Sequence, residues 1–199
     1  MEVLSEIAKA CGFDACGVVP VDVLSRERER LERWIRQGFH AGMNYMANNI
    51  EKRENPALLV EGARSVIVTL TNYYTPKLQL EGIPVVARYA YGKDYHRVVK
   101  DRLFKLYACL EEAIGQKITG RVFVDSAPVF EHEWALRACF GWIGRNSLLI
   151  HPRLGSYCFI GVIISDFEPS RYSLPEERNF CGQCNRCVEA CPTGALFSH

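Results

Sequence analysis

The sequence lacks any long uninterrupted hydrophobic run, although hydrophobic residues make up 48% of it. No stretch reaches the roughly 18 apolar residues that a membrane-spanning helix requires. The first residues, MEVLSEIAKACGF, carry acidic side chains and lack the basic and apolar regions of a secretory signal peptide. We therefore expect a cytoplasmic protein with no membrane contact, and its 199 residues are enough to build a hydrophobic core.

An excess of charge of either sign is also missing. The chain has 24 Lys and Arg residues against 23 Asp and Glu residues, which leaves a formal net charge of +1. This balance provides no global attraction to nucleic acid, so any such contact requires a local patch. Residues 25–37, SRERERLERWIRQ, concentrate arginine, but its alternation with glutamate favours a solvated helix face with ion pairs.

Glycine patterns of the Walker and Rossmann types are absent as well. Gly141, Gly144 and Gly155, together with Asn146 and Ser156, instead indicate loops whose backbone can approach a flat or phosphate-bearing ligand. This spacing alone matches many loops, so it is weak evidence for a site.

Helix-like and strand-like patterns alternate as far as about residue 168. Residues 156–166 are apolar almost throughout, which predicts a strand covered on both faces. The segment EPSRYSLPEERN, residues 168–179, is the expected linker between a domain at 1–170 and a module at 171–199. The expected helices are 2–11, 22–38, 94–114 and 130–139 with a helical turn at 55–58, and the expected strands are 15–21, 65–71, 85–91, 121–125 and 156–166.

Four cysteines near the end of the chain form the most specific motif. Cys181, Cys184, Cys187 and Cys191, followed by Pro192, have the C-x2-C-x2-C-x3-C-P spacing that binds a [4Fe-4S] cluster in bacterial ferredoxins. Zinc is the weaker alternative, because its sites usually pair two C-x2-C knuckles across a longer loop. In two-cluster ferredoxins the fourth cysteine serves the other cluster. No second run follows here, so we expect a truncated form in which Cys191 faces an incomplete cluster.

The other five cysteines are scattered within apolar patterns. This placement favours small core residues over redox or ligand roles for Cys11, Cys16, Cys109, Cys139 and Cys158.

Asp125 ends the predicted strand 121–125, and open α/β sheets place ligand-binding groups at such positions. Pro128 then fixes the turn into the next helix. An Asx turn or a helix cap is the simpler explanation of the aspartate.

Taken together, these residues resemble the epoxyqueuosine reductase family, which completes queuosine synthesis in tRNA. The resemblance covers essentially the whole chain and follows the family's order of motifs. It rests on ARYAYGKDYH (87–96), VDSAPVFE (124–131), GWIGRNSLLI (141–150), GSYCFIG (155–161) and CGQCNRCVEACPTGAL (181–196).

The resemblance implies an α+β fold in two parts. The first is a three-layer αβα, nitroreductase-like domain that binds cobalamin, and the second is a partial ferredoxin-like iron–sulfur module at the C-terminus. The full-length family carries two [4Fe-4S] clusters.

The resemblance also implies roles for particular residues. Asp125 is expected to be the proton donor and to lie at the cobalamin. The other expected contacts of the corrin ring are Arg53, Arg88, Asn146, Ser147 and Ser156. The family's usual lysine in the glycine loop is Arg145 here, its arginine after Glu131 is His132, and a common acidic residue after Gly161 is Val162.

The implied reaction reduces epoxyqueuosine to queuosine in the tRNA anticodon loop, with electrons from an external donor of the ferredoxin or flavodoxin type. An aspartate that acts as an acid at neutral pH needs burial beside an apolar surface. His96 and His132 compete with Asp125 for the acid role. We expect a monomer.

Three alternatives stay open. A corrinoid reductive dehalogenase would share both cofactors but act on an organohalide, and the intact VDSAP block argues against it. An electron-transfer adaptor would bind clusters without catalysis. A truncated chain would fold without turning over any substrate.

Overall fold

The computed structural model describes residues 2–174 and 179–196, and its centre is a four-stranded antiparallel sheet. The strand order is β1-β2-β6-β3. The strands are β1 (Ala15–Pro20), β2 (Ser65–Asn72), β3 (Gly120–Phe123) and β6 (Cys158–Ser165). The mixed helix and sheet composition agrees with the α+β class expected from the sequence.

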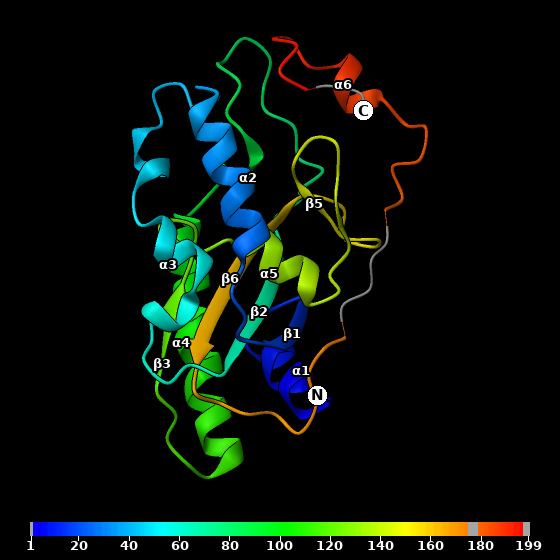
Figure 1. The fold of residues 1–199 in the computed structure, drawn as a ribbon. Coiled ribbons are helices and arrows are strands. Elements are labelled where there is room, and N and C mark those ends of the chain that lie inside the picture. The colour runs from blue at the N-terminus through cyan, green and yellow to red at the C-terminus, as the bar shows by residue number, and fades with distance from the viewer. Residues whose placement is uncertain (1, 175–178, 197–199) are drawn as a thin grey trace.

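Helices cover both faces of the sheet and make it the middle of three layers (Figure 1). On one face, α1 (Glu2–Ala10) and α4 (Tyr95–Ile114) pack against Val18, Ile67 and Ile163. On the other face, α5 (Glu131–Arg137) packs against Val68 and Val162. α2 (Ser25–Arg36) and α3 (Ile50–Glu54) lie on this same side.

The alternation of side chains in β6 explains its sequence. Val162 and Ile164 enter the core beside α5, whereas Ile163 enters the core beside α4. Because both faces of the strand are buried, its central positions on both faces are apolar. The prediction of a doubly covered strand is confirmed.

Smaller elements complete the described chain. A two-stranded hairpin, β4 (Trp142–Ile143) with β5 (Leu149–Ile150), follows α5. The 3-10 helices are η1 (Asn44–Ala47), η2 (Pro56–Leu58) and η3 (Arg88–Ala90), and α6 (Arg186–Glu189) lies in the cysteine segment. No described helix combines the length and the apolar content needed to cross a membrane.

The expected short strand at residues 85–91 is wrong, since this region forms an exposed loop that ends in η3. Val85 is 89% exposed. The side chain of Gln79 forms two hydrogen bonds with the backbone of Val86. It accepts the N–H at 2.9 Å and donates to the carbonyl at 2.6 Å. The backbone groups that a strand would pair are therefore already bonded to a side chain.

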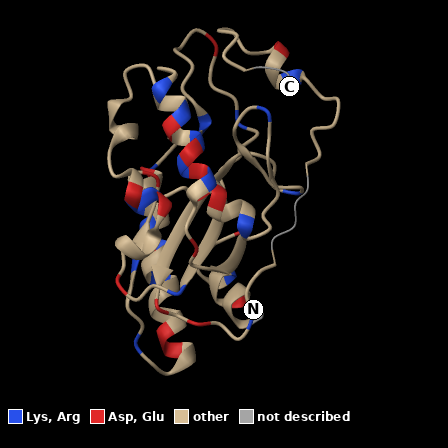
Figure 2. Ribbon diagram, viewed as in Figure 1, with Lys and Arg blue, Asp and Glu red and all other residues tan. Residues whose placement is uncertain are grey.

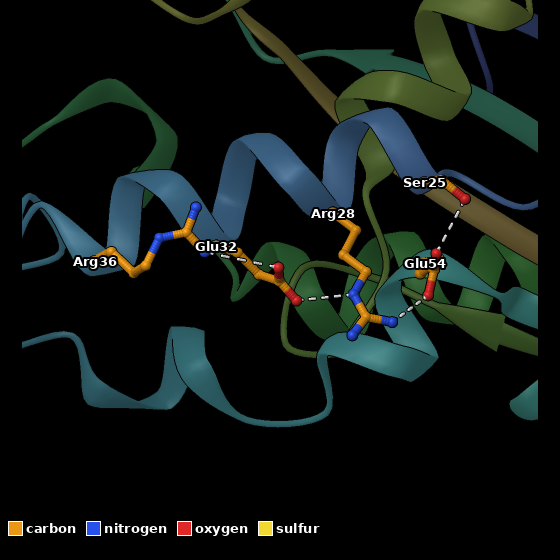
Figure 3. Close-up of polar contacts among 5 residues, drawn as sticks. All are labelled: Ser25, Arg28, Glu32, Arg36 and Glu54. Atoms are coloured by element: carbon orange, nitrogen blue, oxygen red, sulfur yellow. Dashed lines mark hydrogen bonds and ion pairs between the residues drawn. The ribbon is translucent and has the colours of Figure 1, made fainter.

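Basic and acidic residues alternate along α2 (Figure 2). They form ion pairs, as predicted (Figure 3). Arg28 contacts Glu32 at 2.8 Å on its own helix and Glu54 of α3 at 2.7 Å. Arg36 lies 3.9 Å from Glu32, and Ser25 donates to Glu54 at 3.1 Å. These contacts tie α3 to α2.

The expectation of core cysteines holds at four positions and fails at one. Cys11 is buried, and Cys16, Cys109 and Cys158 pack against the two cores. Cys139 is exposed, because it follows α5 in a left-handed turn with φ of 64°.

Candidate functional site

A cavity of about 900 Å³ opens beside the loop that follows β3. Its walls come from α2, η1, α3, the segment 125–133 and the start of the hairpin. Trp34, Tyr45 and Phe130 supply aromatic surface, while Arg53 and Asp125 supply charge. Cavities of this size that combine apolar walls with a few polar groups typically bind ligands.

Asp125 sits in this cavity wall in a left-handed conformation, with φ of 58°. The hydroxyl of Tyr95 donates to its Oδ2, and Nε2 of His96 lies 3.5 Å from the same oxygen. His96 is held in turn by Asp94, whose Oδ1 is 2.8 Å from Nδ1 of the ring. The first residues of α4 therefore hold the Asp125 carboxylate at the wall of the cavity.

The side chain of Asp125 is 61% exposed in the protein itself. The burial that an acid at neutral pH requires must therefore come from a ligand that covers the cavity. Burial and the hydrogen bond to Asp125 raise the pKa of Tyr95, so this phenol keeps its proton.

Glu131 is the functional candidate that the sequence analysis missed. It begins α5, lines the same cavity, and has a buried Oε1 atom with no hydrogen-bond partner among the described residues. Burial, with the charge of Asp125, raises its pKa to about 7. The VDSAPVFE motif contains this residue, but the sequence does not show which acids the fold buries.

The pKa of His132, the residue after Glu131, is shifted so that its neutral form is favoured. Its ring is exposed at the cavity, yet desolvation by the surrounding protein lowers its pKa, against the charge of Asp125. A neutral imidazole near pH 7 is a weaker candidate for a proton donor than a carboxylic acid.

The raised pKa of Glu131 predicts a pH-dependent stability. The folded state keeps this proton up to about pH 7, whereas the unfolded state loses it near its ordinary value of about 4.3. Stability contributed by this group is therefore present at low pH and decreases between about pH 4 and pH 7. We expect Glu131→Gln to be more stable than the parent by up to about 3 kcal/mol at pH 8 and equal at pH 4, measured by urea unfolding. Parallel pH profiles of the two proteins would contradict this.

The residues expected to contact a corrin fall into separate groups in this structure. Arg53 and Asp125 line the same cavity. Arg88 lies on another surface, where its guanidinium is 5.3 Å from the Tyr74 ring and donates to the Tyr157 hydroxyl at 3.3 Å. Ser156 precedes Tyr157 in the chain and does not line the cavity of Asp125.

Asn146 and Ser147 form a third group at the tip of the β4–β5 hairpin. Oδ1 of Asn146 accepts the backbone N–H of Leu148 at 3.2 Å, and Ser147 has a positive φ of 63°. The loop expected from the glycine pattern is present, with both side chains at its turn.

The hairpin also holds the four-cysteine segment. The indole N–H of Trp142 donates to Sγ of Cys181 at 3.4 Å, and its ring packs edge-on against Phe180. Arg145 donates to the carbonyl of Gly182 at 2.9 Å and of Cys184 at 3.1 Å, and also to Asn185. The residue that replaces the family's usual lysine therefore uses the forked guanidinium to hold several acceptors at once.

The four thiols have the right chemistry for an iron–sulfur cluster, since thiolate sulfur is its usual ligand. Hydrogen bonds from Thr193 lower the pKa of Cys191 to about 7, which favours its thiolate. Within residues 2–174 and 179–196, no three Cys, His, Asp or Glu side chains converge as a metal-binding group. The donor set fits a cluster, while the sulfurs are not gathered around a common centre in this structure.

Two family models match the chain. Residues 53–126 match the model described as epoxyqueuosine reductase QueG, and residues 177–197 match the model of a 4Fe-4S binding domain. The first match contains Arg53, Arg88 and Asp125, and the second contains all four cysteines of the motif. Together with the fold, these matches define the class as an α+β domain joined to a 4Fe-4S binding motif.

The curated relatives are named epoxyqueuosine reductase. The protein of Cyclobacterium marinum is 45% identical over 199 residues, and that of Leadbetterella byssophila is 46% identical over 190 residues. These alignments cover 98% and 95% of this chain but 63% and 62% of the relatives. The chain thus spans somewhat less than two thirds of their length. Over this shared segment it is similar to the epoxyqueuosine reductases.

Solved structures agree with this assignment. The epoxyqueuosine reductase of Streptococcus thermophilus superposes with a TM-score of 0.87 at 28% identity, over 98% of this chain and 53% of that one. An epoxyqueuosine reductase solved with an epoxyqueuosine-modified tRNA stem loop gives 0.82 at 30% identity, over 97% and 52%. The reductive dehalogenase NpRdhA gives 0.58 at 16% identity, over 98% and 25%, a likeness of fold alone.

Proposed function

We propose that this protein reduces epoxyqueuosine to queuosine in a tRNA anticodon loop. The similarity to curated epoxyqueuosine reductases over 98% of the chain carries the proposal. A carboxyl-lined cavity beside Asp125 supports it, because the reaction needs an acid close to the departing oxygen. The solved relative with a tRNA stem loop supports tRNA as the partner.

We propose Asp125 as the proton donor of the reaction. Asp125 lines the cavity and its carboxyl group is held by Tyr95 and His96, so it can donate to an oxygen placed beside it. A Bacillus subtilis relative was solved with its catalytic aspartate loop swung out of the active site. A comparable movement of the exposed Asp125 loop would admit a base that has been flipped out of the anticodon stack.

Cobalamin is the cofactor that we propose for the cavity and the neighbouring loops. Nε of Arg53 is buried at the cavity without a hydrogen-bond partner among the described residues, so it can donate to an amide oxygen of a corrinoid. When bound, this group supplies electrons at low potential. The remaining residues proposed to hold it are Arg88, Asn146, Ser147 and Ser156.

The three layers of the fold are consistent with a nitroreductase-like, cobalamin-binding domain at residues 1–170. We propose that residues 171–199 form the ferredoxin-like part, with [4Fe-4S] ligands Cys181, Cys184, Cys187 and Cys191. An external donor of the ferredoxin or flavodoxin type would deliver the electrons. We further propose that the protein acts as a monomer in the cytoplasm.

An anaerobic titration of the purified chain with cobalamin, followed by visible absorbance, tests this proposal. We expect stoichiometric cobalt in the protein fraction, a spectrum shifted toward the base-off form, and iron in the same fraction. The same material should then convert epoxyqueuosine in tRNA in the presence of a low-potential reductant. Retention of iron without cobalt would favour the electron-transfer adaptor instead, and turnover of an organohalide in place of the tRNA would favour the dehalogenase.

A further inference from the structure

Glu131 is a second carboxyl group in the cavity of Asp125, and the proposed function so far leaves it unused. Both side chains line the cavity, and Oε1 of Glu131 is buried without a hydrogen-bond partner among the described residues. An ionised carboxylate loses solvation in such a position, and its Oε1 gains no hydrogen bond in exchange. The geometry therefore favours a Glu131 that holds a proton.

The proposed reaction consumes two protons. Reducing an epoxide to an alkene breaks two C–O bonds, forms one C=C bond and releases the oxygen as water. This change needs two electrons, which a low-potential one-electron donor of the ferredoxin or flavodoxin class supplies in two transfers. Asp125 carries a single proton, so a second one must reach it during each turnover.

Resting on this proposed function, we propose that Glu131 is the second proton store of the site and returns a proton to Asp125 across the cavity. Asp125 first protonates the oxygen that leaves the ring. The O–H bond of Glu131 then breaks as one forms on Asp125, which protonates the same oxygen again to release water. Solvent restores the proton of Glu131. Because Glu131 acts through Asp125, it is a positioning residue.

The electrostatics of the cavity suit this role. Burial and the charge of Asp125 raise the pKa of Glu131 to about 7, while a backbone hydrogen bond from Asp125 and the charge of Arg53 act in the opposite direction. A group that titrates near neutrality can both hold and release a proton at working pH. The titratable and charged groups around Glu131 are Asp125 before α5, Arg53 of α3, Tyr95 of α4, His132 and Glu133 of α5, and Glu27 and Arg30 of α2.

A titration of the Glu131 carboxyl group tests its coupling to Asp125, and it needs neither cofactor nor tRNA. The chain is labelled with glutamate carrying ¹³C at the side-chain carboxyl, and Glu131→Gln identifies the resonance. We expect Glu131 to titrate near pH 7 in the parent and at lower pH in Asp125→Asn, because the neighbouring negative charge is removed. His96→Gln is the matched control, since His96 also contacts Asp125 but is not among the groups that shift Glu131.

The inference is overturned if Glu131 titrates near the ordinary value of about 4.3, or if Asp125→Asn leaves its midpoint unchanged. A shift of equal size in His96→Gln would also count against it, because the effect would then be nonspecific.

Turnover supplies the second readout. In the presence of cobalamin, reductant and epoxyqueuosine tRNA, we expect Glu131→Gln to lower kcat at least about tenfold and to lose the decline in rate above pH 7. Glu112→Gln, the same substitution at an exposed position of α4, is the control and should leave the rate unchanged. An unchanged rate and pH profile in Glu131→Gln would overturn the inference. An inactive parent would contradict the proposed function instead, and the carboxyl titration would then decide the inference alone.

Discussion

Asp125→Asn is expected to abolish turnover of epoxyqueuosine tRNA while the fold and cobalamin retention remain intact. Asparagine tolerates the left-handed φ of 58° at this position and can still accept the hydrogen bond from Tyr95. Its amide has no acidic proton to give to the departing oxygen. Loss of a general acid typically lowers the rate by about 10²- to 10⁴-fold. The measurement is the rate of queuosine formation by the cobalamin-loaded protein.

Asp101→Asn provides the control for this substitution. Asp101 is exposed on α4, away from the cavity walls, so the same chemical change there should leave the rate unaltered. Circular dichroism and cobalt content should match the parent in both variants. Full activity in Asp125→Asn would remove Asp125 from the mechanism and direct attention to His96 and His132.

Gly141→Ala is expected to destabilise the hairpin that holds the cysteine segment. A Cβ atom at this position would lie 2.0 Å from the carbonyl oxygen of Ile150, and the backbone has φ of 138°. The partner atom belongs to the backbone, so the β4–β5 pairing must open to relieve the clash. We expect a loss of about 4 kcal/mol, of which about 3 comes from overpacking and the rest from backbone strain.

Gly155→Ala is the matched control for the hairpin. Gly155 also has a positive φ, 71°, but a Cβ atom added there would meet no other atom within 4 Å, so only about 1 kcal/mol of strain is expected. Urea unfolding gives both values. Since Trp142 and Arg145 contact the cysteine segment, Gly141→Ala should also speed alkylation of Cys181 and Cys184. Equal destabilisation in the two variants would show that backbone strain, and not the clash with Ile150, determines the cost.

Much of the fold follows from patterns that depend on neighbours along the chain. The apolar run of 156–166 predicts β6, because a strand buried on both faces has no polar side. Asp94 and Asn55 accept the backbone N–H groups of His96 and Ala57, as helix-capping residues do. α4 begins within one residue of its expected start, whereas α2 begins at Ser25 instead of at residue 22. The strand predicted at 85–91 is wrong because the side chain of Gln79 forms hydrogen bonds with the backbone of Val86. No periodicity in the sequence indicates this contact.

The sequence by itself determined the main helices, the four strands of the central sheet, the family motifs and the spacing of the four cysteines, since each is local along the chain. It did not indicate α3 or the β4–β5 hairpin. Only the tertiary structure decided that Asp125 is exposed, that Oε1 of Glu131 is buried in the same cavity, and that Arg53 shares that cavity. It also decided that Arg145 holds the cysteine segment. The physical reason is that solvation and the pKa of an acid depend on the atoms that surround it, and here those atoms come from α2, α3, α4 and α5, which only folding brings together.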